Sequence, residues 1–396
     1  MSKGSKLARV RAKLERKLAG GWARTVCASP QRPDGSRDEE VLAGPGPLSA
    51  PDPEAFAALW RAIEDAAGRG LVKLTVVVDD RHRLEVDARH GHLKARVLDD
   101  ETVAKIMGGK DRSLRPDGSA ALLRAIGIMN ADGSISARSA KKYKQVNHLV
   151  ELCRPVWEAL LAGRGDRGEL RIVDLACGNS YLSFVLLEAL RLEGAPARLL
   201  GVDLREDVIE TSRARAAEIG MGEQAHFLAT RLESLRRETI EAALGGPADL
   251  AISLHACDTA TDAALDLALA AEVRAILCVP CCQAELARQL EAASGASGLE
   301  ALPPALLDQG LLRRHLGEVL TDALRVEVLE AWGYQVSVVE FVDSAHTPKN
   351  LLLRALPGRG RSAAARATAL AAVERRCEAL GVRPRLLQLA LARSSD

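Results

Sequence analysis

The residues of this sequence that best fit a chemical role form the short segment 174–180, Asp-Leu-Ala-Cys-Gly-Asn-Ser. The segment follows an apolar run typical of a buried strand, and its small residues let the backbone come close to a ligand. A second apolar run ends about thirty residues later in Asp203, where a carboxylate could accept hydrogen bonds from both hydroxyls of a ribose. Ligands of open α/β sheets bind beyond the carboxyl ends of such strands. The two segments therefore predict a site for a nucleoside-containing cofactor.

The glycine content of the turn indicates which cofactor to expect. Dinucleotide sites usually carry three glycines that let a pyrophosphate settle on the start of a helix. Here Gly178 stands between Ala176 and Ser180, so no pyrophosphate cradle is evident. S-adenosyl-L-methionine has no phosphate, and we predict it as the cofactor; the alternative is a tight turn without a ligand. The predicted cofactor-binding residues are Asp174, Ala176, Cys177, Gly178, Asn179, Asp203, Thr230, Leu254, His255 and Lys144.

The segment after the fourth apolar run is the candidate site of chemistry, because methyl transfer requires a positioned nucleophile and, where needed, a base. His255 is a plausible base by its ordinary pKa, and Asp258 is a second candidate; the alternative is that His255 is structural. The Asp/Asn-Pro-Pro-aromatic group of enzymes that methylate base amines is missing here. The Lys-Asp-Lys-Glu set of ribose methyltransferases is incomplete, since Lys144, Asp258 and Lys349 supply only part of it.

The fifth apolar run ends in Pro280, Cys281, Cys282 and Gln283, which adds thiols to the same edge of the predicted sheet. Three interpretations compete for these cysteines. They could be small packing residues, Cys281 could attack a pyrimidine ring as a nucleophile, or the thiolates could hold a metal. The predicted catalytic residues are Asp258, His255 and Cys281, and we predict no metal.

The third apolar run departs from the common pattern of such folds. It ends in Thr230, where an acid often contacts adenine. We expect Thr230 to replace that acid only weakly.

Bulk composition excludes some classes of protein. Hydrophobic residues make up 47% and charged residues 27% of 396 residues, as in a globular protein. No apolar run is long enough to span a membrane, and the amino terminus lacks the apolar core of a secretion signal. We therefore expect a cytoplasmic protein with reduced cysteines.

A basic run near the amino terminus could attract an anionic partner or could be a solvated helix face. Its cations are Lys3, Lys6, Arg9, Arg11, Lys13, Arg16, Lys17 and Arg24, against the single acid Glu15.

Two main domains are expected from the pattern of elements. Residues 1–135 predict an α+β domain: a basic helix over 1–26, a Pro/Gly-rich loop, a helix near 54–67 and a small meander. The loop spans 29–53, and the meander strands span 71–78, 83–88 and 92–97.

The second predicted domain, 136–358, alternates short apolar runs with helical stretches, which is typical of βα units around a parallel sheet. Two further runs are joined by a short polar link and predict an antiparallel hairpin at the sheet edge. Five βα units and a hairpin predict the seven-stranded, Rossmann-like sheet of class I methyltransferases. Residues 359–396 predict a helical extension packed on the outside. The runs are 170–175, 198–203, 225–229, 249–255, 275–279, 334–342 and 349–355.

Three segments together resemble a known family, namely 174–184, 255–262 and 280–283. They are similar to the methyltransferase domain that eukaryotic tRNA ribose 2′-O-methyltransferases share with other methyltransferase-like proteins. The helix over 141–147 is similar to the family's Lys/Gln helix ahead of the cofactor turn. The resemblance implies a bacterial member with an extra amino-terminal region, and it implies the fold, the cofactor and an RNA substrate. The zinc modules of the eukaryotic tRNA enzymes are missing.

We therefore favour methylation of tRNA or rRNA as the function. A methyltransferase for a protein or a small molecule is the second hypothesis. A cofactor-binding or RNA-binding module without catalysis is the third.

Overall fold

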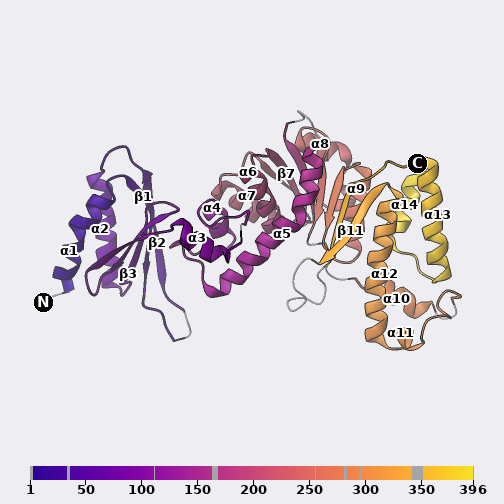
Figure 1. The fold of residues 1–396 in the computed structure, drawn as a ribbon, viewed down its shortest axis with the longest axis horizontal. Helices are drawn as coiled ribbons and strands as arrows, with labels where there is room; N and C mark the ends of the chain where they lie inside the picture. The colour runs from indigo at the N-terminus through magenta and orange to yellow at the C-terminus, as the bar shows by residue number, and fades with distance from the viewer. Residues whose placement is uncertain are drawn as a thin grey trace. The chain divides into compact units, whose positions relative to one another are not determined.

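The computed structural model describes residues 3–33, 36–110, 112–162, 168–254, 256–280, 283–293, 296–340 and 351–395. The chain divides into two units, residues 1–144 and residues 145–396. The first unit ends inside helix α5 (Ala137–Ala162), whereas the sequence placed a boundary at residue 135. Figure 1 shows both units and labels the elements for which there is room.

The first unit is an α+β domain built on a five-stranded antiparallel sheet of order β2-β1-β3-β4-β5. Helix α1 buries Val10, Leu14 and Leu18 in the same hydrophobic core as Trp60 of α2. These residues, the last of which directly follows the helix, recur at the four-residue spacing of one helix face, which leaves Arg11, Lys13, Arg16 and Lys17 exposed. The elements are α1 (Lys3–Lys17), β1 (Gly21–Ala28), β2 (Glu39–Pro47), α2 (Pro53–Gly68), β3 (Lys73–Val77), β4 (His82–Asp87), β5 (His92–Val97), α3 (Asp100–Met107) and α4 (Ala120–Ala125).

Two parts of the sequence-based prediction for this unit are wrong. The basic helix ends at Lys17, and Gly21–Ala28 is strand β1. The predicted loop over 29–53 contains strand β2, Glu39–Pro47. Its prolines are tolerated because β2 is an edge strand, where a missing N–H costs no ladder bond. Gly44 lies so close to β1 that a Cβ there would be 2.1 Å from the Trp22 carbonyl oxygen. The glycines and prolines that indicated a loop therefore serve a closely paired edge.

The second unit contains a seven-stranded sheet of order β11-β12-β10-β9-β6-β7-β8, in which only the pairings of β12 are antiparallel. This order confirms the predicted α/β fold with its closing hairpin. The elements are β6 (Leu170–Leu175), α6 (Tyr181–Leu192), β7 (Ala197–Asp203), α7 (Glu206–Glu218), β8 (Ala225–Ala229), the 3₁₀ turn η1 (Leu232–Ser234), α8 (Arg237–Leu244), β9 (Leu250–Ser253), α9 (Thr259–Ala270), β10 (Ala275–Cys278), α10 (Glu285–Ala292), α11 (Ala305–Asp308), α12 (Gly310–Ala331), β11 (Tyr334–Glu340), β12 (Leu351–Pro357), α13 (Ala363–Ala379) and α14 (Arg385–Ser395).

The strand order reverses at β6, which lies between β7 and β9. Chain segments after β6 run one way to β7 and β8 and the other way to β9 and β10, so the loops at the carboxyl end of β6 diverge. Such a reversal leaves a crevice where ligands of open α/β sheets bind. The predicted cofactor turn follows β6 directly, which puts it at this crevice.

The carboxy-terminal residues fold as two helices, α13 and α14 (Figure 1). Leu370, Val373 and Leu386 from these helices are buried in one core cluster with Val173 of β6 and Ile276 of β10. Burying each large apolar side chain contributes roughly 1.5–3 kcal/mol. The tail is therefore an integral layer of the second unit.

Candidate functional site

The turn between β6 and α6 is held in an unusual backbone conformation. Ala176, Gly178 and Ser180 have φ values of 63°, 54° and 55°. The left-handed region costs a non-glycine residue about 1–3 kcal/mol, so two of the three residues adopt it against their preference. Strained backbone of this kind concentrates at ligand sites. The turn thus forms with a single glycine, which explains how it departs from the glycine-rich pattern.

Asp203 ties this turn to the neighbouring loops. Its Oδ2 accepts a hydrogen bond from the Gly178 amide at 2.9 Å, and its Oδ1 accepts one from the Arg205 amide at 3.0 Å. Its backbone oxygen accepts from the amide of Thr230 at 2.9 Å. A carboxylate has about four acceptor positions, so two amide bonds leave capacity for hydroxyl donors. The structure therefore brings Gly178, Asp203 and Thr230 together, and their binding of a cofactor stays a prediction.

Asp174 lies beneath the turn, at the end of β6, and is 2% exposed. The Ser183 hydroxyl donates to Oδ2, while Oδ1 is buried without a hydrogen-bond partner among the described residues. Burial raises the pKa of Asp174 to about 7, and the nearby charge of Asp203 adds to this effect, against the hydrogen bond from Ser183. An acceptor left unpaired in this way is a position for a cationic or hydrogen-bonding ligand group.

Cys177 packs under the turn and has no reactive character. Its side chain is buried, and burial together with Asp174 raises the pKa of its thiol, so the thiol stays neutral. A Cβ on Gly201 would lie 3.2 Å from the Cys177 sulfur and 2.6 Å from the ring of Phe227. Gly201 thus makes room for the sulfur and the ring below the cofactor turn.

Two arginines of α7 buttress this edge and were not identified from the sequence. Arg215 donates to the carbonyl oxygen of Asn179 at 2.6 Å, and Arg213 donates to that of Phe227 at 2.9 Å. The sequence does not show which backbone carbonyl an arginine will bind. The only signal for these two residues was the charged face of the helix predicted over α7.

The described residues that follow β9 and β10, namely 254, 256–258, 279, 280 and 283, will be called the acceptor rim, with a first segment after β9 and a second after β10. Leu254 is buried. His255, Cys281 and Cys282 lie outside the described residues, and so does Lys349. The roles predicted for these residues stay predictions.

Asp258 is placed on the rim with φ 49°. Its Oδ1 accepts from the amides of Ala284 and Glu285 at 3.1 and 3.3 Å, and its Oδ2 lies 3.5 Å from an Arg288 nitrogen. A carboxylate at these amides caps the first turn of α10. This gives Asp258 a structural role, and its predicted catalytic role is a separate matter that stays a prediction.

A buried polar cluster stands behind the rim and was missed by the sequence analysis. Arg325 of α12 is 1% exposed and donates to Asp262 at 2.8 Å and to the Asp258 carbonyl oxygen at 3.0 Å. Its other nitrogen lies 3.4 Å from Asp322, which accepts from the Gln283 amide group. The only signal in the sequence was the pair of opposite charges three residues apart in an otherwise amphipathic helix.

The remaining thiols do not form a metal site among the described residues. No group of three His, Cys, Asp or Glu side chains within the described ranges could hold a metal. Cys278 is buried, and Cys257 is exposed. Lys144 is the last residue of the first unit, and its predicted cofactor contact stays a prediction.

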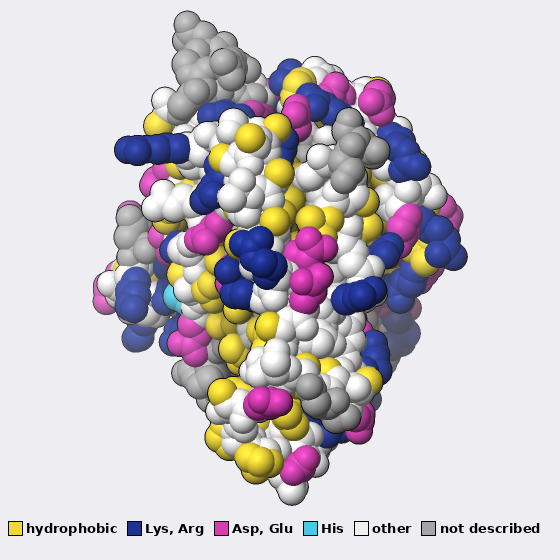
Figure 2. All heavy atoms as spheres, turned by 90° about the vertical axis from the view of Figure 1, so that its right-hand side faces the viewer, with side chains coloured by type: hydrophobic (Ala, Val, Ile, Leu, Met, Phe, Trp, Pro, Cys, Tyr) yellow, Lys and Arg dark blue, Asp and Glu magenta, His cyan; other side chains and the backbone are white. Residues whose placement is uncertain are grey.

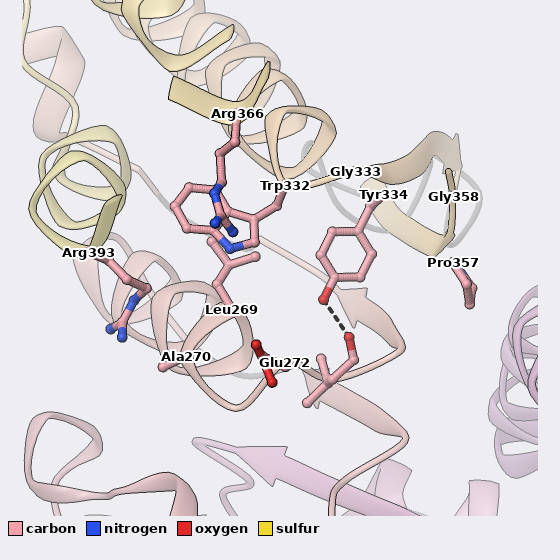
Figure 3. A pocket seen from close by; sticks show the side chains of 11 residues that line it. Leu269, Ala270, Glu272, Trp332, Gly333, Tyr334, Pro357, Gly358, Arg366 and Arg393 are labelled. Atoms are coloured by element: carbon pink, nitrogen blue, oxygen red, sulfur yellow. Dashed lines mark hydrogen bonds between the residues drawn. The ribbon is translucent and has the colours of Figure 1, made fainter. Parts of the chain in front are cut away.

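A surface hollow of about 450 Å³ lies at the ends of the strands opposite to the cofactor turn, where β10 and β11 begin and β12 ends. In Figure 3, Arg366 lies over the ring of Trp332, and a dashed line joins the hydroxyl of Tyr334 to a backbone oxygen, which belongs to Val273. The guanidinium carbon is 4.9 Å from the indole centroid, and the Tyr334 hydroxyl donates to the Val273 oxygen at 2.5 Å. The hollow is thus separated from the cofactor turn by the length of the strands.

The strand order and the turn define the class of fold, that of class I methyltransferases. Residues 141–289 match a family model described as a methyltransferase domain. The chain therefore contains a methyltransferase domain. No curated protein matches the chain.

Solved structures with a similar fold are remote in sequence. The S-adenosylhomocysteine-bound methyltransferase PaMTH1 of Podospora anserina is 16% identical, covers 66% of this chain and 95% of its own, and has a TM-score of 0.36. The O-methyltransferase of Bacillus cereus, in complex with S-adenosylhomocysteine, is 12% identical, with 65% and 96% covered and a TM-score of 0.35. Cofactor-bound Rv0187 from MTB is 15% identical, with 65% and 95% covered and a TM-score of 0.34. None of these similarities decides the acceptor of this chain. Among the described helices, none is long and apolar enough to cross a membrane.

Proposed function

We propose that this protein transfers the methyl group of S-adenosylmethionine to an RNA, with the cofactor held at the carboxyl ends of β6 and β7. When bound, the cofactor supplies an electrophilic methyl group on a sulfonium. The chain's own task is to hold that group in line with an acceptor atom and to exclude competing water.

The unpaired acceptor beneath the turn supports this cofactor most directly. Asp174 Oδ1 is buried without a partner among the described residues, and S-adenosylmethionine carries both an ammonium and a sulfonium. Asp203 keeps acceptor capacity for ribose hydroxyls after its two amide bonds. The left-handed turn at Ala176, Gly178 and Ser180 brings backbone rather than side chains toward the ligand. The residues present thus fit the cofactor.

The division of charge along the chain favours an RNA acceptor. Residues 1–144 contain 27 Lys and Arg against 19 Asp and Glu, a net charge of +8, whereas residues 145–396 contain 27 against 34, a net charge of −7. A polyanion is attracted to the first unit and repelled by the second. A small neutral acceptor would give no reason for such a division. The first unit is therefore proposed as the part that holds the RNA.

Helix α1 presents the clearest basic surface of the first unit. Arg11, Lys13, Arg16 and Lys17 are all exposed, because the apolar face of the helix is buried. None of these four has an acidic partner within 4 Å among the described residues, so their charge is available to phosphates. By contrast, the face of the second unit formed by its carboxy-terminal helices mixes cations, carboxylates and apolar side chains (Figure 2).

The test is transfer of a tritiated methyl group from the cofactor to total bacterial RNA. Labelled RNA is expected with the full chain and is expected to be lost with Asp203→Ala. The matched control is Asp207→Ala, since Asp207 lies four residues on and its side chain is 77% exposed. Labelling of protein or small metabolites without labelling of RNA would contradict the RNA acceptor and support the second hypothesis.

Cofactor binding is checked separately by calorimetry with S-adenosylhomocysteine. Binding that disappears in Asp203→Ala and persists in Asp207→Ala supports the proposed cofactor site at the carboxyl ends of β6 and β7. Failure of the unaltered protein to bind would contradict it. The methylated nucleoside is then identified by mass spectrometry of RNA from a strain without the gene, compared with its parent.

A further inference from the structure

We infer that Arg325 is a positioning residue for methyl transfer, which locks the two segments of the acceptor rim in one relative placement. The inference rests on the methyltransferase activity and not on the nature of the acceptor. It concerns the rim because β9 pairs directly with β6, so the residues after β9 and β10 border the cofactor edge.

Arg325 is bonded to the last residue of the first segment, Asp258, and to Asp262 of the helix α9 that follows it. Nε donates to Asp262 Oδ1 at 2.8 Å, and a terminal nitrogen donates to the Asp258 carbonyl oxygen at 3.0 Å. Asp258 has φ 49° and ψ −124°, which lies outside the left-handed helical region that aspartate tolerates, so its surroundings must impose this conformation. The bond to its carbonyl is one of the interactions that impose this conformation. The course of the chain where it leaves the rim and enters α9 is thus set by the guanidinium.

The second segment is fixed through Asp322. This carboxylate lies 3.4 Å from Arg325 and accepts a hydrogen bond from the side chain of Gln283, the residue that closes the rim. Asp258 adds a link from the first segment to the residue that follows the second, since its Oδ1 accepts from the Ala284 amide at 3.1 Å. Arg325 therefore stands at the centre of a network that joins both segments to α12.

The composition of the cluster argues for a role beyond stabilising the fold. The side chains of Arg325 and Asp262 are 2% and 3% exposed, and buried charges lose the hydration that they have in water. Burial opposes the charge of Arg325, but the bonds to Asp262 outweigh it and raise the pKa of the guanidinium; burial raises the pKa of Asp262. Replacing a buried ion pair by apolar residues of similar volume is often neutral or stabilising, so stability of the fold does not account for the cluster. The planar guanidinium presents its N–H donors in a rigid arrangement, which fixes the relative positions of the groups that it binds.

Methyl transfer requires the acceptor rim to hold the acceptor atom in line with the methyl group. Displacement at a methyl carbon depends on alignment, and a misplacement of about 1 Å can cost about 100-fold in rate. The network sets the distance between the segment after β9 and the segment after β10. Lysine at position 325 would keep the charge but could hold only part of the network, since it lacks the fork.

The first experiment compares Arg325→Lys and Asp262→Asn in the full chain with Asp266→Asn as the matched control. Asp266 lies one turn further along α9 and pairs with Arg393 at 2.7 Å, away from the rim. For Arg325→Lys and Asp262→Asn, kcat for tritium transfer is expected to fall about 10- to 100-fold. The cofactor KM and the Kd for S-adenosylhomocysteine should stay within about threefold. The control should retain activity within about twofold.

The second experiment needs no acceptor and so separates this inference from the proposed RNA substrate. Cys257 is exposed on the rim, and its reaction with a maleimide is followed by peptide mass spectrometry. Arg325→Lys is expected to change the rate of modification at Cys257 several-fold, and Asp266→Asn is expected to leave it unchanged. Hydrogen exchange at the Ala284 and Glu285 amides should accelerate in the same variant.

Two results would overturn the inference. The first is full kcat in a folded Arg325→Lys variant. The second is a loss of activity that Asp266→Asn reproduces at equal loss of thermal stability. If Arg325→Lys does not fold, Gln283→Met carries the test, because it removes one link to the rim and leaves every charge in place. The same fall in kcat at constant cofactor KM is then expected, and unchanged kcat counts against the inference.

Discussion

Asp174 shows how one residue can favour binding at the expense of stability. Its carboxyl is buried, and burial raises its pKa from 3.8 to about 7. The folded protein therefore holds a proton on Asp174 that the unfolded chain releases between those values. The associated stability is complete below the unfolded pKa and is lost as pH rises through the folded pKa. The change of pKa corresponds to about 4 kcal/mol at most.

Asp174→Asn is expected to remove this pH dependence. The variant should be more stable than the unaltered protein at pH 8 and should lose less stability between pH 5 and pH 8, as measured by urea unfolding. Its affinity for S-adenosylhomocysteine should fall, because a cationic ligand group loses its carboxylate. The control Asp207→Asn changes an exposed acid and should alter neither property. If stability depends on pH equally in Asp174→Asn and in the unaltered protein, the raised pKa of Asp174 is refuted.

Gly201 gives a steric prediction at the same edge. A Cβ there would approach the Phe227 ring to 2.6 Å, whereas a Cβ on Gly222 would approach nothing closer than 4.0 Å. Overpacking of this kind typically costs about 1–3 kcal/mol. Gly201→Ala should therefore lower the unfolding free energy by that amount and weaken cofactor binding, and Gly222→Ala should do neither. The measurement is chemical denaturation together with calorimetry.

At the scale of elements, helix α10 depends on a cap that comes from another segment. Asp258 Oδ1 accepts from the Ala284 and Glu285 amides, and loss of such a cap costs about 0.5–2 kcal/mol. Asp258→Ala should reduce stability by this amount. Asp258→Asn keeps an acceptor oxygen and should retain most of the stability.

The same pair of variants tests the predicted catalytic role of Asp258. An amide cannot take a proton from an acceptor hydroxyl or amine. If Asp258 is the base, Asp258→Asn loses turnover while stability and cofactor affinity stay close to those of the unaltered protein. Activity in Asp258→Asn would limit Asp258 to capping α10.

The limits of sequence reasoning also appear at the scale of elements. The strands of the second sheet were predictable because buried parallel strands form short apolar runs between turns. The edge strand β2 was missed because its half-exposed residues, prolines and glycines resemble a loop. The Arg325 cluster could not be predicted, since its partners lie 63 and 67 residues away and nothing local indicates which carboxylate or carbonyl a buried arginine meets. The turn next to Asp174 and Asp203 was predictable because both residues lie at the carboxyl ends of apolar strands.

At the scale of the whole molecule, the separation of charge gives a prediction about RNA binding. The first unit has a net charge of +8 and the second −7, so phosphates should displace counterions mainly at the first unit. Each neutralised phosphate contributes about 0.7–0.9 to the slope of log K against log salt concentration.

Changing Lys13, Arg16 and Lys17 of α1 to glutamine should therefore reduce the magnitude of that slope by about 2 and weaken binding at low salt. The matched control changes Arg359, Arg361 and Arg375, which are also exposed cations but belong to the second unit, and should leave the slope unchanged. Fluorescence anisotropy with labelled tRNA at several salt concentrations measures both variants in the full chain. Equal slopes for the two triple variants would show that α1 does not contact the RNA, while the cofactor edge of the second unit would be unaffected by that result.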